Sequence, residues 1–279
     1  MKKKSKWSTL FLILIFIIGL SVMLYPAIST YWNERTQSQA IVRYESIMNE
    51  LDEDKLSAMF DQAEQYNRKL CGLDFPLLDY RQIEGYHAAL NMNETGMIGF
   101  LTIETLGLQL PIYHTTSNDV LGNAAGHLEG SSLPTGGIGN HCVISAHRGL
   151  PNATLFTNLD HMEVGHTFQI TVLNRVLTYQ VDQIKTVIPS DTTELQINPN
   201  EDYCTLLTCT PYGINTHRLL VRGKRVVNPN QAVLSVVSDA QQIDIMIVTP
   251  VVALPILLIL MIVVLCRPIK KDDIGDELE

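Results

Sequence analysis

A cysteine and an arginine on either side of a tight turn are the residues of this sequence best suited to chemistry. The run from Tyr203 to Thr208 is rich in Thr, Leu and Tyr, as strands are, and an apolar pattern resumes from Arg218 to Val221 after a turn containing Pro, Gly and Asn. Residues equally far from a hairpin turn face each other across strands ~4.8 Å apart, so we expect Arg218 to lie beside Cys209. A guanidinium there would stabilise a thiolate nucleophile and a developing oxyanion. The alternative interpretation is a buried structural cysteine beside a surface arginine.

A cysteine nucleophile also needs a general acid and base, and three histidines are candidates. His147 follows a strand predicted from His141 to Ala146 and precedes a Gly/Pro loop, a position typical of sites carried on loops over a rigid scaffold. His217 neighbours Arg218, but alternation along a strand places it on the other face. His141 begins its strand, far from the end that His147 occupies. The geometry therefore favours His147.

The remaining cysteines and histidines predict neither a metal site nor a disulfide framework. Of the five cysteines, Cys71, Cys142 and Cys204 lie in apolar runs or at a helix end and are expected to pack as small hydrophobes. His141 and His147 would be separated by ~20 Å along a strand, too far apart to share one ion. We expect no metal and no cofactor. The net charge of −9 argues against a nucleic-acid partner.

Many short strands with turn signals must position these residues. Alternating patterns predict strands within 96–112, 141–146, 168–172, 176–181 and 185–189, followed by the hairpin at 203–227. Such a pattern favours a mainly β domain, either a closed barrel or a sandwich. In front of it, residues 33–70 carry apolar positions at helical spacing and predict one or two amphipathic helices.

Two apolar segments flank this domain and predict membrane helices. Residues 7–25 and 245–266 are each about long enough to cross a bilayer. Lysines precede the first segment and basic residues follow the second, so both ends are expected in the cytoplasm and the domain between them outside the cell membrane. The alternative for the first segment is a cleaved signal peptide, with small residues near 27–29.

Two separated motifs resemble the sortase family. The residues TLLTC, from Thr205 to Cys209, match the TLxTC signature of sortases. Their continuation CTPYGINTHRLLVRG, and HRGLPNATLFTNL from His147 to Leu159, resemble the class C, pilus-assembling sortases of Gram-positive cells. The resemblance covers roughly 96–227 and implies the eight-stranded sortase β-barrel.

The resemblance also implies roles for three residues. Cys209 would be the nucleophile, attacking the Thr–Gly bond of an LPxTG-like sorting signal to form a thioacyl enzyme. His147 would be the general acid and base, and Arg218 would hold the substrate and stabilise the oxyanion. The implied partners are pilin subunits: one donates the sorting signal, and a lysine of the next accepts it.

One segment departs from the class C pattern. These sortases carry a lid with an Asp-Pro-aromatic anchor, whereas this chain has Asp74-Phe75-Pro76, with the proline after the aromatic residue. Asp74 and Phe75 are candidate lid residues, and an ordinary loop is the alternative. Proline restricts the backbone of the residue before it, so the altered order changes the allowed conformation of the segment.

Two rival functions remain open. One is a housekeeping sortase that attaches proteins to the cell wall, and the other is a non-catalytic membrane-anchored scaffold. The predicted organisation has seven parts, in chain order: a cytoplasmic basic end (1–6), a transmembrane helix or signal-anchor (7–25), a helical lead-in with the candidate lid (33–90), the catalytic β-barrel (91–230), a linker (231–244), a transmembrane helix (245–266) and a cytoplasmic tail (267–279).

Overall fold

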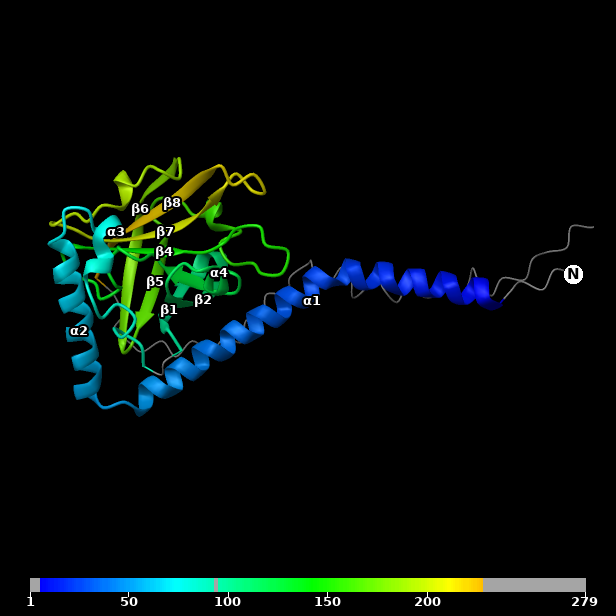
Figure 1. Cartoon of the computed structure of the whole chain (residues 1–279), viewed down its shortest axis with the longest axis horizontal. Helices are drawn as coiled ribbons and strands as arrows, with labels where there is room; N and C mark the ends of the chain where they lie inside the picture. Colours follow the sequence, from blue (N-terminus) through cyan, green and yellow to red (C-terminus); the bar gives the residue numbers. More distant parts are fainter. Residues whose placement is uncertain (1–5, 93–94, 228–279) are drawn as a thin grey trace, which may run out of the picture. The chain divides into compact units, whose positions relative to one another are not determined.

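The alternating runs of the sequence form strands that close into a barrel in the order β1-β2-β3-β4-β7-β8-β6-β5 (Figure 1). The computed structural model describes residues 6–92 and 95–227. The barrel strands are β1 (Met97–Ile103), β2 (Leu108–His114), β3 (Ala125–His127), β4 (Asn140–Ser145), β5 (Thr167–Val172), β6 (Arg175–Val187), β7 (Asp202–Thr210) and β8 (His217–Arg225). The prediction of a closed barrel of eight strands is confirmed.

Alternation along β7 and β8 separates a barrel interior from an outer face. Cys204, Leu206 and Val221 are fully buried and belong to the main core, while Cys209 and Arg218 are only half-buried. The two strands are antiparallel, and Cys209 pairs with Arg218 in their register, as the turn position predicts. The hairpin thus places the thiol-bearing and guanidinium-bearing residues side by side, on the face away from the core.

Two parts of the sheet differ from the sequence interpretation. The stretch predicted as loops with a short helix contains α4 (Asn118–Leu121) but also β3, which pairs with β2 in parallel and with β4 antiparallel. The predicted strands at 176–181 and 185–189 are one strand, β6, with a register shift between Val181 and Gln183 where it pairs with β8. The shift lets one long strand bend and continue its pairing.

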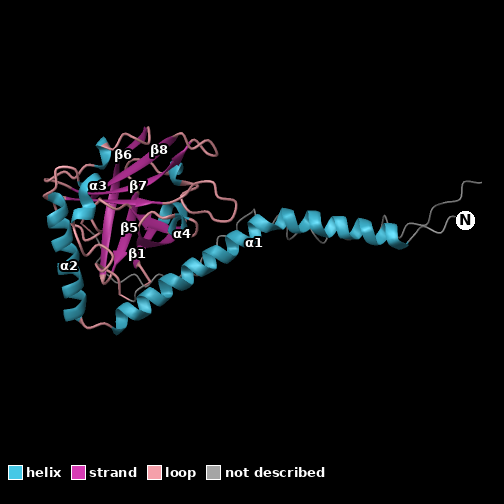
Figure 2. Cartoon of the chain, viewed as in Figure 1, coloured by secondary structure: helices cyan, strands magenta, loops and turns pink. Residues whose placement is uncertain are grey.

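In the described residues three helices precede the barrel, and Figure 2 draws them in cyan. They are α1 (Lys6–Glu50), α2 (Glu53–Cys71) and α3 (Pro76–Asp79), and short 3₁₀ turns are η1 (Tyr80–Gln82), η2 (Glu104–Leu106), η3 (Leu159–His161) and η4 (Thr193–Leu195). Asn67 fastens α2 to the barrel: its Nδ2 donates to the carbonyl of Leu133 and to Oγ1 of Thr135, each at 3.0 Å. The compact unit that holds the barrel begins at Ile28.

One helix in the described part of the chain is long and apolar enough to cross a membrane. The segment, Ile13–Glu50, contains a window with a mean hydropathy of 2.2 and lies near the N-terminus. It includes most of the predicted span at 7–25. The second predicted span, 245–266, lies outside the described residues, as do the linker at 231–244 and the tail at 267–279.

Candidate active site

The predicted site residues lie on or just past the ends of neighbouring strands. β4 and β7 are parallel, and their last described pair is Ser145 with Leu207. His147 lies two residues beyond Ser145, past the end of β4, and Cys209 lies two residues beyond Leu207 and pairs with Arg218 on β8. Alternate residues of a strand share a face, so Cys209 and Arg218 lie on the outer face of the sheet, on strands ~4.8 Å apart.

Hydrogen bonds carry this parallel alignment past the end of β4. The amide of Ala146 donates to the carbonyl of Leu207 at 3.2 Å, and Oγ1 of the buried Thr208 donates to the carbonyl of Ala146 at 2.8 Å. Thr208 is the residue directly before Cys209. The chain that enters His147 is therefore held against the strand that carries the cysteine.

Arg218 rests on its own turn rather than on Cys209. Its Nη1 donates to the carbonyls of Asn215, at 3.3 Å, and of His217, at 3.1 Å. Cys209 is a free, half-buried thiol. The guanidinium of Arg218 and the thiol of Cys209 thus belong to paired residues. Among the described residues no carboxylate is ion-paired to Arg218, so its guanidinium is available to a substrate oxygen.

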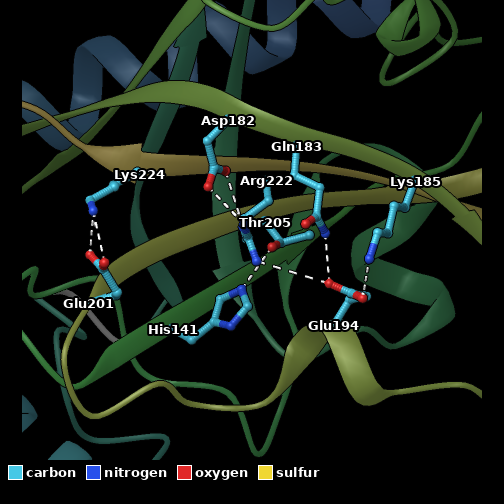
Figure 3. A network of polar contacts seen from close by, with 9 residues as sticks. All are labelled: His141, Asp182, Gln183, Lys185, Glu194, Glu201, Thr205, Arg222 and Lys224. Carbon is cyan, nitrogen blue, oxygen red and sulfur yellow. Dashed lines mark hydrogen bonds and ion pairs between the residues drawn. The ribbon is translucent and has the colours of Figure 1, made fainter.

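The other two candidate histidines, His141 and His217, lie away from Cys209. His141 is 1% exposed, and its Nδ1 is hydrogen-bonded to the carbonyl of Gln196 at 2.9 Å. Its Nε2 is hydrogen-bonded to Oγ1 of Thr205 at 2.7 Å (Figure 3). Burial lowers the pKa of His141 and favours a neutral, structural ring. His217 pairs with Thr210 on the opposite face from Cys209.

The far end of the same outer face carries an ion-pair network, drawn in Figure 3. Arg222 grips Asp182 with two hydrogen bonds of 3.1 and 2.7 Å, and Glu194 accepts from Gln183 and pairs with Lys185. The network borders a cavity of about 340 Å³. These charged groups are paired with one another, so the network joins the loop between β6 and β7 to the sheet and is not a second reaction centre.

The candidate lid residues lie just before α3. Asp74 and Phe75 are exposed, Phe75 by 64%, and in the described residues no hydrogen bond or ion pair joins Asp74 to Arg218. Leu77 of α3 packs instead on an apolar cluster that includes Leu220. The structure therefore brings Leu77 of α3 into contact with the apolar cluster that includes Leu220 of β8.

The sequence interpretation did not single out Arg148, which directly follows His147. Its Nη1 donates to Oγ1 of Thr210 at 3.4 Å, and Thr210 directly follows Cys209. Adjacency to the histidine was the only sequence signal for this residue. Within residues 6–92 and 95–227, no group of three or more His, Cys, Asp or Glu side chains is arranged to hold a metal ion.

Comparisons with known proteins agree with this architecture. A family model described as "Sortase domain" matches residues 101–226. The chain is 44% identical to sortase C1 from Streptococcus agalactiae, with a TM-score of 0.62 over 68% of this chain and 99% of that one. It is 42% identical to sortase C from Streptococcus pneumoniae, whose structure bears on catalysis and pilin substrate specificity, with a TM-score of 0.60 over 68% of this chain and 97% of that one.

A curated relative matches over a shorter stretch. The chain is 30% identical over 117 residues to Sortase A of Streptococcus agalactiae serotype III, covering 41% of this chain and 47% of that protein. The chain thus spans about half the length of this curated relative. The family model falls on the part of the chain that forms the barrel.

Proposed function

Because this chain belongs to the sortase family and its structural neighbours include class C pilus sortases, we propose that it is a cysteine transpeptidase that joins pilin subunits outside the cell. α1 would anchor it in the membrane, together with the apolar segment at 245–266. The observation that carries the proposal is the pairing of Cys209 with Arg218 across β7 and β8, with the segment that enters His147 hydrogen-bonded to β7.

A nucleophile at Cys209, an acid and base at His147 and a cation at Arg218 support a two-step acyl transfer. In the first step, the Cys209 thiolate attacks the threonine carbonyl of an LPxTG-like sorting signal, and Arg218 stabilises the negative oxygen of the tetrahedral intermediate. His147 then protonates the glycine amine as the Thr–Gly bond breaks, which leaves a thioacyl enzyme. In the second step, His147 removes a proton from a lysine amine of the next subunit. That amine attacks the thioester, forms an isopeptide bond and releases Cys209.

A second candidate function is attachment of surface proteins to the cell wall. The match to a curated Sortase A favours it, and it uses the same thioacyl enzyme. The two functions differ only in the amine that accepts the acyl group. The acceptor is therefore the property that an experiment has to separate.

We expect the purified chain, supplied with an LPxTG-type donor peptide, to prefer a lysine side chain as acceptor. Two acceptor peptides are compared, one with a blocked N-terminus and a single lysine, the other with a free N-terminal glycine and no lysine. Mass spectrometry of the products should show the lysine-linked product in excess by about tenfold or more, as a site shaped for one amine allows. Product from the glycine peptide alone would favour the cell-wall function.

The segment before and through α3 supports a lid over this site. Leu77 packs against the cluster of Val143, Leu195 and Leu220, and Leu220 lies two residues beyond Arg218 on the same face of β8. Asp74 and Phe75 directly precede α3. We propose that α3 keeps this segment over the face of the sheet that carries Cys209. Release of α3 from the sheet would admit the sorting signal.

Loosening α3 should accelerate acylation. Leu77→Ala removes part of a half-buried contact, which weakens the packing of α3 by on the order of 1 kcal/mol and raises its open fraction several-fold. The rate of thioacyl formation should then rise by about threefold to tenfold. Leu78→Ala is the matched control, because Leu78 is the next residue and is 78% exposed. Equal rates for the two variants would contradict a lid at this position.

A further inference from the structure

A buried arginine links the two strand ends that carry the proposed site. The side chain of Arg148 is 9% exposed, its Nη2 pairs with Oδ2 of Asp160 at 2.5 Å, and its Nη1 donates to Oγ1 of Thr210 at 3.4 Å. Arg148 directly follows His147, and Thr210 directly follows Cys209. One guanidinium therefore joins the backbone segment of the histidine to that of the cysteine.

The loop that follows Arg148 is closed around this contact. The amide of Phe156 donates to the carbonyl of His147 at 3.0 Å, and the amide of Gly149 donates to Oγ1 of Thr157 at 3.2 Å. Gly149 has a φ of +78°, and a Cβ atom there would lie 2.9 Å from the ring of Tyr212, in the turn after β7. The loop thus contacts the end of β7 through Arg148 and the turn after β7 through Gly149.

Two nitrogens of the Arg148 guanidinium have partners and the third has none, which argues against a role in stability alone. Its Nε is buried and has no hydrogen-bond partner among the described residues. A buried donor without a partner costs stability, and an ion pair whose carboxylate is 42% exposed adds little. The planar fork of the guanidinium does, however, reach Asp160 and Thr210 at once, which no other side chain does as rigidly.

We propose that Arg148, held by Asp160, is a positioning residue that keeps the imidazole of His147 beside the thiol of Cys209. The need arises because His147 lies beyond the last described β4–β7 pair, so the ladder no longer fixes it. Acid–base chemistry demands placement to within about 1 Å. The inference rests on the proposed function, since it assigns Arg148 a purpose only if His147 and Cys209 work together.

The first test needs no peptide substrate. The full-length chain is alkylated with iodoacetamide over a range of pH, and the reaction at Cys209 is followed by peptide mass mapping, which separates it from the exposed Cys71. A nearby imidazole alters the pH midpoint of thiolate reactivity. We expect His147→Ala to move that midpoint and Arg148→Met to move it in the same direction by about half as much or more. Arg81→Met, on the exposed η1, is the matched control and should leave the midpoint unchanged.

Each outcome separates this inference from the proposed function. A shift in His147→Ala with none in Arg148→Met would overturn the positioning role and leave the proposed function intact. No shift in His147→Ala would overturn the assignment of His147, and the positioning role with it. If Arg81→Met also moved the pH midpoint, and by as much as Arg148→Met, the shift would be a general effect of removing a positive charge. That result would also overturn the inference.

A second measurement guards against a variant that simply unfolds. With an LPxTG-type peptide, Arg148→Met should lower kcat for acylation about 100-fold with KM changed less than about twofold, while the thermal midpoint of unfolding stays close to that of the parent. Arg148→Lys keeps the charge without the fork and should lose about tenfold. Asp160→Asn should lie between the two. A loss of kcat that tracks the loss of thermal stability across the three variants would indicate a structural role only.

Discussion

Replacing Cys209 with alanine is expected to abolish the thioacyl adduct that the chain forms with an LPxTG-type peptide. Without the sulfur there is no atom to carry the acyl group, so the loss in rate should be on the order of 10⁴-fold or more. Intact-mass measurement of the protein after incubation with the peptide reports the adduct directly. Its added mass identifies the bond that was cleaved, and with it the reaction class.

The matched control for this variant is another cysteine of the same strand. Cys204 is fully buried and pairs with Cys142 across β4 and β7, so it faces the barrel interior. Cys204→Ala should retain the adduct at a rate close to that of the parent, because only packing is changed. An adduct on the Cys209→Ala variant would sink the proposed mechanism. If the parent and Cys204→Ala both fail to form the adduct, even with Leu77→Ala added to loosen α3, a non-catalytic scaffold is the better description of the chain.

The hairpin that carries this site could be predicted because its information is local. Pro211, Gly213 and Asn215 confine the turn, so Cys209 and Arg218 must be paired if both flanking runs are strands. The alternation of apolar residues then decides which face each occupies. No long-range contact is needed for this part of the fold.

The position of the histidine was harder to predict, because it depends on a parallel pairing. β4 and β7 are separated by long loops and other strands, and no turn sets their register. The sequence showed only that His147 ends a strand near a loop. β3 escaped notice for a related reason: Ala125–His127 is too short and too fully buried to show alternation.

The contacts of Arg148 could not be predicted from any periodic pattern. Arg148 and Asp160 lie at the two ends of an irregular loop, where a charged side chain ordinarily faces solvent. Their pairing depends on how that loop folds back, which is fixed by contacts such as the one between Phe156 and His147. Only the structure reveals that a charged loop residue is buried beside the proposed site.

Replacing His147 with alanine should slow acylation by a peptide far more than acylation by a donor with a good leaving group. A glycine amine must be protonated as it departs, so loss of the general acid should lower the rate about 10²- to 10⁴-fold. A donor peptide whose Thr–Gly amide is replaced by a thioester releases a thiolate, which needs no proton. For that donor the loss should be about tenfold or less.

The other two candidate histidines, His217 and His141, supply the controls. His217→Ala changes a half-buried ring on the opposite face of the sheet and should leave both rates near those of the parent. His141→Ala removes two hydrogen bonds and should lower thermal stability without separating the two donors. Equal losses with both donors in His147→Ala would show that the ring serves binding or packing. A selective loss would instead assign it the proton that leaves with the amine, which is the step that makes cleavage of an amide by a thiol possible.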